Sequence, residues 1–148
     1  MKQNIPYKFN PFPIYYKGGS IEPPVPVVGD SLTFIGKDAS NAVALSAVGA
    51  PCAIVLDYSK NGGAWTAYTV GDIIELNQNE TVAFSGNNEY ISNGADPETF
   101  YWYYHKFVMT GSIEASGNIQ SLVNFSDNVS GYGYYKLFAD CTSLLTAP

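Results

Sequence analysis

The stretch 53–86 constrains the fold most, because turn-forming residues divide it into four short runs of β-prone residues. It reads AIVLDYSKNGGAWTAYTVGDIIELNQNETVAFSG, and the runs cover residues 53–58, 64–69, 73–76 and 81–84. Asn61, Gly62 and Gly63 between the first two runs are a strong hairpin signal, because such a turn needs residues that accept positive φ. We therefore predict a meander of antiparallel strands here.

Further β-prone runs extend this pattern along the chain, at residues 31–35, 41–47 and 100–108. A chain of 148 residues is long enough for one domain with a real core and short appendages. Short strands separated by turns are typical of an all-β domain. We expect an antiparallel β-sandwich, Ig-like or jelly-roll-like, over residues 30–125.

The run FYWYYHKFV at residues 100–108 is the most aromatic part of the chain. As a strand it would place aromatic rings on both faces, with Phe100, Trp102 and Tyr104 on one side and Tyr101, Tyr103, His105 and Phe107 on the other. This pattern favours a strand covered on both sides, by the core or by another subunit. The residues proposed for a subunit or glycan contact are Tyr101, Trp102, Tyr103 and Tyr104. A carbohydrate platform, with Trp65 added, is the alternative, since rings that stack on sugars must be exposed.

The charge of the chain argues against a nucleic-acid surface. The net charge is −6, only 14% of the residues are charged, and all 7 basic residues are lysines. Nucleic-acid binding needs clustered cations that neutralise phosphates, and arginine is the usual bidentate phosphate ligand. We expect no nucleic-acid partner.

No catalytic group stands out in the sequence. The single histidine, His105, has no Ser or Cys nucleophile identifiable beside it and is interpreted as structural. Asp57 and Asp72 stand where a turn would place a carboxylate in any case. We expect no enzyme activity and no cofactor.

The polar loop 87–98 and the two cysteines offer candidate metal and disulfide sites. Glu89, Asp96 and Glu98 offer oxygen ligands for Ca²⁺, but their spacing matches no calcium loop, which favours a solvated loop. Cys52 and Cys141 fit no metal spacing. They are either one disulfide or two buried thiols.

The first 29 residues differ in character from the rest of the chain. Residues 1–16 form an aromatic arm that we interpret as a docking arm, which would lie along a partner by strand addition or by pockets for alternate side chains. The anchoring side chains would be Ile5, Tyr7, Phe9, Phe12, Ile14, Tyr15 and Tyr16. Residues 17–29 form a Gly- and Pro-rich linker that should be extended. The alternatives are a disordered leader or a strand that folds back on the domain.

Neither an export signal nor a membrane span is predicted. Lys8 and Asn10 interrupt the place where a signal peptide has its apolar core, and prolines surround them. No apolar run approaches the length of a membrane-spanning helix. We expect no membrane insertion and no export by the usual route.

The last residues, YKLFADCTSLLTAP at 135–148, resemble one unit of the BspA-type leucine-rich repeats found on Bacteroidales surface proteins. The matching residues are Leu137, Phe138, Cys141, Thr142, Ser143, Leu144, Ala147 and Pro148. Upstream, SKNGGAWTAY, ELNQNETVAFSGNN and MTGSIEASGNIQSLVNF are similar to the β-domain that often precedes such repeats. The resemblance implies that residues 126–148 open a leucine-rich-repeat solenoid, capped by the β-domain.

A single repeat cannot bury its own hydrophobic face, so we expect that the natural chain continues beyond Pro148 or that a partner covers the repeat. An adhesin-like body with an anchoring arm and no export signal is typical of a bacteriophage virion component. This comparison predicts a structural fibre or decoration protein on head or tail, located in the virion. It would form a homo-oligomer, expected to be a trimer, and present an adhesive surface to host glycans or surface proteins.

Two other functions remain open. The first is a fragment of a Bacteroidales cell-surface adhesin, which would place the protein on the bacterial surface. The second is a carbohydrate-binding module carried by Tyr101, Trp102, Tyr103 and Tyr104 together with Trp65.

Overall fold

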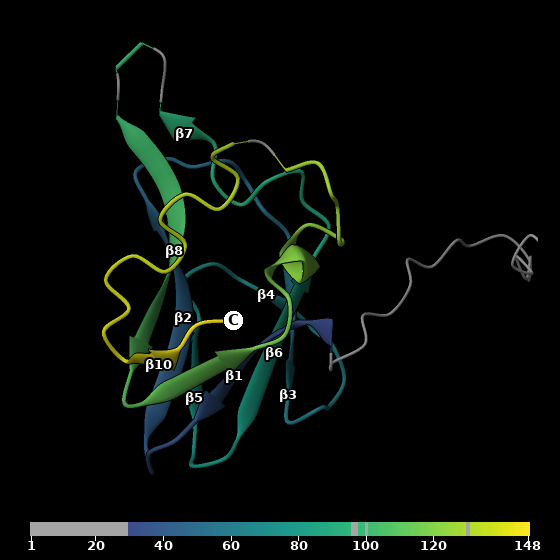
Figure 1. Ribbon diagram of the computed structural model, residues 1–148, viewed down its shortest axis with the longest axis vertical. Helices are drawn as coiled ribbons and strands as arrows, with labels where there is room; N and C mark the ends of the chain where they lie inside the picture. Colours follow the sequence, from purple (N-terminus) through teal and green to yellow (C-terminus); the bar gives the residue numbers. More distant parts are fainter. Residues whose placement is uncertain (1–29, 96–97, 100, 130) are drawn as a thin grey trace, which may run out of the picture.

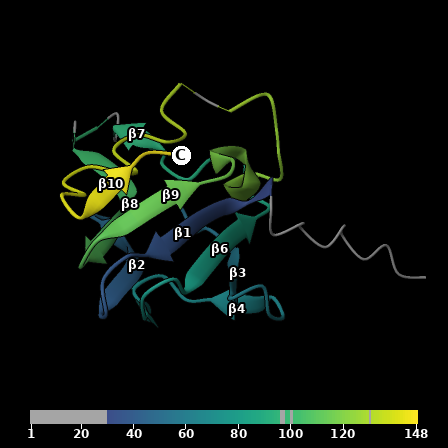
Figure 2. The same ribbon diagram turned by 60° about the horizontal axis from the view of Figure 1, so that its bottom comes forward.

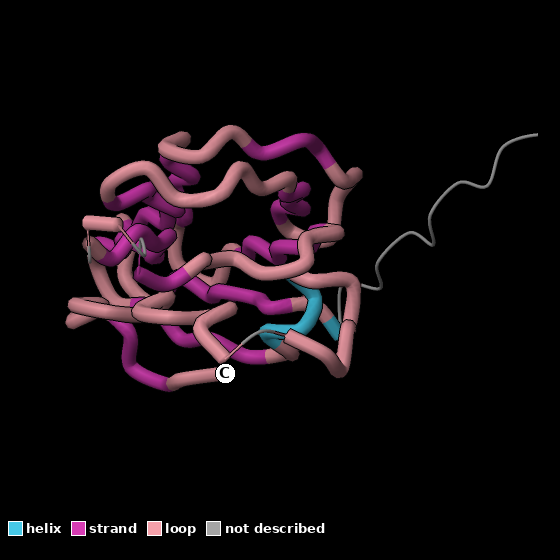
Figure 3. The backbone as a smooth tube through the Cα atoms, turned by 90° about the horizontal axis from the view of Figure 1, so that it is seen from above, coloured by secondary structure: helices cyan, strands magenta, loops and turns pink. Residues whose placement is uncertain are grey.

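The computed structural model describes residues 30–95, 98–99, 101–129 and 131–148. The predicted anchoring arm at 1–16, with all of its proposed anchoring side chains, and the linker at 17–29 lie outside these residues. The described part is organised in two β-sheets (Figure 1), which confirms the all-β class. Helical turns are confined to one side of the molecule (Figure 3).

The larger sheet has six strands. In spatial order these are β10 (Leu144–Thr146), β9 (Ile113–Ser116), β1 (Leu32–Gly36), β6 (Thr81–Gly86), β3 (Leu56–Lys60) and β4 (Thr66–Tyr68). Figure 2 shows β9, β1 and β6 side by side, with β10 at the edge. All neighbours are antiparallel except β10, which is parallel to β9.

The smaller sheet has four antiparallel strands. In spatial order these are β5 (Ile73–Leu76), β2 (Asn41–Val48), β8 (Trp102–Thr110) and β7 (Gly94–Ala95). The ladder between β2 and β8 is the longest, running from Ala42 opposite Thr110 to Val48 opposite Tyr104. Burial alternates along β2, with Val43 and Leu45 buried and their neighbours Ala42 and Ala44 partly exposed. One face of this sheet therefore points into the core.

The hairpin predicted at residues 61–63 is confirmed. It joins β3 to β4, with Tyr58 opposite Thr66 and Leu56 opposite Tyr68. Asn61 and Gly62 have positive φ, of 53° and 70°, as the turn requires. The amide of Gly63 donates to the carbonyl of Lys60 at 2.9 Å and closes the turn.

The prediction that stretch 53–86 forms one meander is wrong beyond this hairpin. After β4 the chain leaves the six-stranded sheet, and β5 pairs with β2; β6 then returns and pairs with β1 and β3. The Tyr68 hydroxyl accepts from the amide of Leu45 at 2.8 Å and donates to the carbonyl of Asp72 at 2.6 Å. Tyr68 of β4 thus links the six-stranded sheet to the four-stranded sheet. Turn residues alone do not encode the pairing of β5 with β2.

The first predicted run also begins later than expected, at Leu56 instead of residue 53. The amide side chain of Asn88 accepts from the Val55 N–H at 2.8 Å and donates to the Val55 carbonyl at 2.9 Å. Because a side chain satisfies both backbone groups of Val55, that residue makes no ladder bonds there.

The core contains side chains of both sheets. Phe34 of β1 and Phe84 of β6 contact Phe107 of β8, with ring centroids 4.8 and 5.4 Å apart. All three rings are buried and meet edge to face, the arrangement that aromatic pairs prefer. Phe107 therefore connects the four-stranded sheet to the six-stranded one.

Candidate functional site

The most distinctive surface of the described chain is a group of aromatic side chains beside β8, called here the aromatic cluster: Trp102, Tyr104, Tyr132 and Tyr135. Trp102 stacks on Tyr135 with centroids 4.5 Å apart and an angle of 27° between the rings. Tyr132 meets Trp102 edge to face at 5.2 Å, and Tyr104 meets Tyr135 in the same way at 5.7 Å. Trp102 and Tyr132 remain 38% and 54% exposed, so part of the cluster faces solvent.

Lys136 adds a positive charge to the aromatic cluster. Its Nζ lies 5.3 Å from the ring centroid of Tyr104 and 5.4 Å from that of Tyr135. Both distances are within the range of a cation–π interaction. Next to it, Lys106 Nζ lies 3.0 Å from the carboxylate of Asp140, which raises the pKa of Lys106. The cluster therefore combines aromatic faces with the cation of Lys136, and the Lys106–Asp140 ion pair lies near it.

The C-terminal segment, residues 131–148, holds the cluster in place because it runs along β8 (Figure 1). Phe107 N donates to the carbonyl of Leu137 at 2.8 Å, and the ring of Phe138 stacks on Phe107 at 5.7 Å. Leu137 is only 2% exposed. Because β10 then joins β9, this segment contacts both sheets along one side of the domain.

The loop before β8 forms hydrogen bonds with the C-terminal segment. The amides of Ile91 and Ser92 both donate to the carbonyl of Gly133 at 2.9 Å, and Ser92 Oγ donates to the carbonyl of Tyr135 at 3.3 Å. Ile91 and Ser92 are fully buried. The stretch interpreted as a solvated loop therefore has a buried centre and includes the short strand β7.

The four residues proposed for a subunit or glycan contact have different surroundings. Trp102 and Tyr104 belong to the aromatic cluster, whereas Tyr103 is half-buried with its ring against Gly49. Tyr101 precedes β8 and is 68% exposed. Trp65 lies before β4, which is at the far edge of the six-stranded sheet from β10, so the fold does not join it to the cluster.

The predicted alternation along β8 agrees with the burial pattern. His105, Phe107 and Met109 are buried, while Trp102 and Val108 are exposed. Phe100, which the prediction placed with Trp102, lies outside the described residues.

Three residues in or beside the aromatic cluster were not identified from the sequence: Tyr132, Tyr135 and Lys136. The signal that could have found them is the Gly- and Tyr-rich run GYGYYK at 131–136, directly before the repeat-like motif. Its rings meet those of β8 only through the long-range packing of the C-terminal segment, which local periodicity does not report.

His105 has the surroundings of a structural residue. It is 3% exposed, and its Nδ1 lies 2.7 Å from the carbonyl oxygen of Ile91. Burial lowers the pKa of His105, so the neutral ring that donates to this carbonyl is the favoured form. The hydrogen bond fixes the loop before β8 to the strand.

Both cysteines are free thiols, which answers the question that the sequence left open. Cys141 Sγ donates to the carbonyl of Phe107 at 3.1 Å, and Cys52 Sγ donates to the carbonyl of Ile91 at 3.7 Å. Burial raises the pKa of both thiols. Asp96 of the calcium candidates lies outside the described residues, and the described part contains no group of three or more His, Cys, Asp or Glu side chains that could hold a metal ion.

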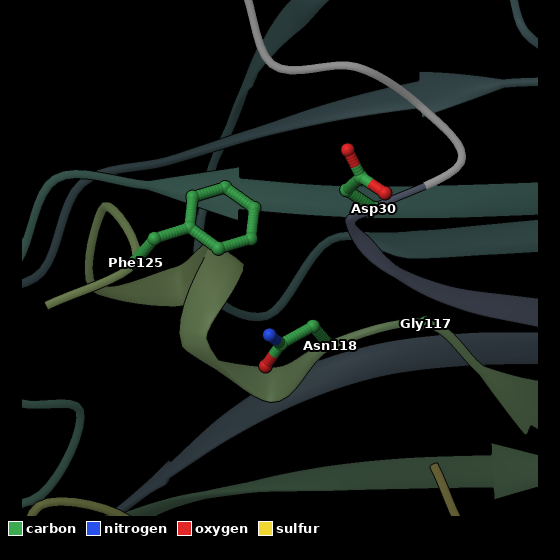
Figure 4. Close-up of a pocket in the computed structure, with 4 residues that line it drawn as sticks. All are labelled: Asp30, Gly117, Asn118 and Phe125. Atoms are coloured by element: carbon green, nitrogen blue, oxygen red, sulfur yellow. The ribbon is translucent and has the colours of Figure 1, made fainter. Parts of the chain in front are cut away.

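A hollow of about 450 Å³ lies where β1 begins, lined by Asp30, Gly117, Asn118 and Phe125 (Figure 4). The side chain of Asn118 caps the 3-10 helix η2 (Ile119–Leu122), since its Oδ1 accepts from the amide of Gln120 at 2.8 Å. The lining offers one carboxylate and one amide already engaged in this cap. We assign no chemistry to it.

No family model, no curated protein and no solved structure matches the chain. Among the described residues, no helix has the length and apolar character needed to cross a membrane.

Proposed function

We propose that the protein is a structural virion component, a fibre or decoration protein of head or tail, which its N-terminal arm anchors to other virion proteins. Its two sheets would form an Ig-like or jelly-roll-like sandwich. Residues 126–148 would be the first unit of a leucine-rich-repeat solenoid. The domain would face the host surface and bind a glycan or a surface protein there.

The observation that carries this proposal is how the repeat-like segment meets the β-domain. Leu137 is buried in the core, and Phe138, Cys141 and Leu144 pack against it, so the domain covers the apolar face that a single repeat would leave open. β10 is the edge strand of its sheet and runs parallel to β9. The resemblance would make the β-domain the cap of a leucine-rich-repeat solenoid at this edge.

Peptide mass spectrometry on gradient-purified particles from a lysed culture of the source tests the proposal. The virion function predicts that peptides of this chain band with the particles, and that deletion of residues 1–16 leaves the domain folded but prevents incorporation. Peptides found only in the outer-membrane fraction of uninfected cells would instead support a Bacteroidales cell-surface adhesin.

The aromatic cluster favours a second candidate function, a carbohydrate-binding module. Exposed parts of Trp102 and Tyr132, with Lys136 beside them, offer stacking faces and a hydrogen-bond donor. Isothermal titration of host polysaccharide should then give heat that Trp102→Ala removes and Trp65→Ala retains. Absence of heat with the unaltered protein would contradict this function.

A further inference from the structure

The outer face of the four-stranded sheet carries apolar side chains where an exposed antiparallel sheet usually carries polar ones. These residues, called here the apolar face, are Ala42, Ala44 and Val48 of β2, Ile73 of β5, and Tyr104 and Val108 of β8. Ile73 is 69% exposed and Val108 is 44% exposed. They flank Ala44 in one row, since Ala44 is opposite Ile73 on one side and opposite Val108 on the other.

Side-chain sizes on the apolar face set a row of small residues between larger ones, called here the groove. Ala42, Ala44 and Ser46 form a floor of small side chains along β2, which lies between β5 and β8. Ile73 and Val108 lie on either side of that floor. A second surface with the same pattern could place its larger side chains in this groove, as packed sheets interdigitate their side chains.

Two opposite charges beside the groove are arranged symmetrically about Ala44, and one of them, Lys106, also contacts Asp140 of its own chain at 3.0 Å. Glu75 of β5 is opposite Ala42, and Lys106 of β8 is opposite Ser46. Ala42 and Ser46 lie two residues before and two residues after Ala44, so the two charges stand on opposite sides of it. With strands about 4.8 Å apart and a rise of about 3.4 Å per residue, each charged residue is roughly 8 Å from Ala44 along the sheet.

This arrangement is complementary to itself. A two-fold axis in the plane of contact, passing over Ala44 and perpendicular to the line from Glu75 to Lys106, exchanges the two positions. Lys106 of one copy then meets Glu75 of the other, and the reverse contact forms at the same time. Closed two-fold pairs use one self-complementary patch in this way.

We propose that the apolar face is the contact surface between two copies of this chain, related by a two-fold axis over Ala44. The pairing buries Ile73 and Val108 of each copy in the groove of the other, and the Glu75–Lys106 contacts fix the register. It does not depend on the anchoring arm or on the adhesive target. It predicts pairs at this face, in contrast to the trimer expected from the sequence.

Sedimentation equilibrium of the full chain tests the pairing. We expect a species of twice the 16.0 kDa of one chain at concentrations up to about 0.1 mM, a range that covers even weak self-association. Ala44→Glu places two like charges on the axis and should weaken the association at least tenfold. Thr33→Glu, on the outer face of β1 in the other sheet, is the matched control and should leave it unchanged.

Circular dichroism verifies that each variant is folded, and Val108→Lys, at an exposed position of the same face, replaces Ala44→Glu if that variant unfolds. A wild-type chain that stays at the mass of one copy would overturn the proposal, including the case in which residues 1–29 cover the face. A three-copy mass, or an association that both variants leave intact, would overturn it as well.

Discussion

The two sheets share one core but present different outer faces. On the six-stranded sheet the positions facing away from the core that keep some exposure are mostly polar or small, whereas Ser59, Ala83 and Ser85 on the same face are buried. The partly or fully exposed positions are Thr33, Ile35, Asp57, Ala67, Thr81, Glu114 and Ser116. On the four-stranded sheet, Ala44, Ile73 and Val108 form the central row of the outer face, and Ser46, Glu75, Lys106 and Thr110 surround it. The first pattern suits a face in contact with water, and the second suits a face in contact with protein.

This difference indicates which part of the described chain is suited to contact with another protein. The apolar face and the aromatic cluster adjoin each other, because Tyr104 belongs to both and is opposite Val48. Among the described residues, the exposed large apolar side chains Ile73, Trp102 and Val108 lie on the four-stranded sheet, and Tyr132 and Leu145 lie on the C-terminal segment.

The largest difference in stability is expected between substitutions on the inner and the outer face of β8. Phe107→Ala removes the ring that connects the sheets and should lower the free energy of unfolding by about 3–5 kcal/mol. Val108→Ala, the next residue and on the outer face, should change it by no more than about 0.5 kcal/mol in dilute solution. Urea unfolding monitored by circular dichroism measures both. Equal losses would show that the outer face of β8 is as buried as the inner one.

The second prediction concerns the side of the domain that the C-terminal segment covers. Leu137→Ala should cost about 2–5 kcal/mol, because the side chain is buried against the core. Leu145→Ala is the control, since Leu145 is 60% exposed, and should cost about 0.5 kcal/mol or less. If Leu137→Ala is as mild as its control, the segment is not part of the folded domain.

A smaller effect is expected at the end of the six-stranded sheet. Ser121 Oγ accepts from Leu32 N and donates to the carbonyl of Phe84, both at 2.9 Å, and the hydroxyl is buried. Ser121→Ala leaves two buried backbone groups without this partner and should cost about 1–3 kcal/mol. Thermal unfolding compares it with Ser116→Ala at an exposed position of β9. A variant as stable as wild type would mean that other groups satisfy both backbone atoms.

The smallest effect should come from the turn between β5 and β6, where the chain crosses from one sheet to the other. The Glu80 carboxylate accepts from Asn77 N at 2.8 Å and contacts Lys60 Nζ at 3.0 Å, which lowers its pKa to about 2. Because the pKa is lower in the folded state, this contribution to stability is complete above pH about 4.5 and is lost as the pH falls toward about 2. Glu80→Gln should remove that part of the acid dependence. An unchanged pH profile of unfolding would contradict the turn geometry.

Local sequence signals predicted where the strands lie but not how they pair. Asn61 and Gly62 identified the hairpin because positive φ is a local requirement. The alternation along residues 100–108 was likewise readable, since it placed His105 and Phe107 on one side of the strand, but it did not indicate which side is buried. The pairing of β5 with β2 was not readable from the sequence. It depends on the contacts of Tyr68 with Asp72 in the next turn and with Leu45, which lies in a strand of the other sheet.

The candidate site was also predicted only in part, because some of its residues are identified by local sequence and others only by long-range contacts. Trp102 and Tyr104 belong to an aromatic run of the sequence, so their residue type and spacing were enough to propose them as contact residues. Tyr135 and Lys136 become partners of that run only when the repeat-like segment packs on β8. Their role therefore requires a tertiary contact that neither periodicity nor composition encodes.

The most direct test of the two-fold pairing mixes two charge variants. Lys106→Glu gives a copy in which positions 75 and 106 are both acidic, with Asp140 beside position 106, and Glu75→Lys gives a copy in which both positions are basic. Each variant alone should sediment as one copy, because like charges then face each other in both contacts. A one-to-one mixture should restore the pair. A mixture that stays at the mass of one copy, or variants that pair alone as tightly as wild type, would contradict the assignment of the apolar face.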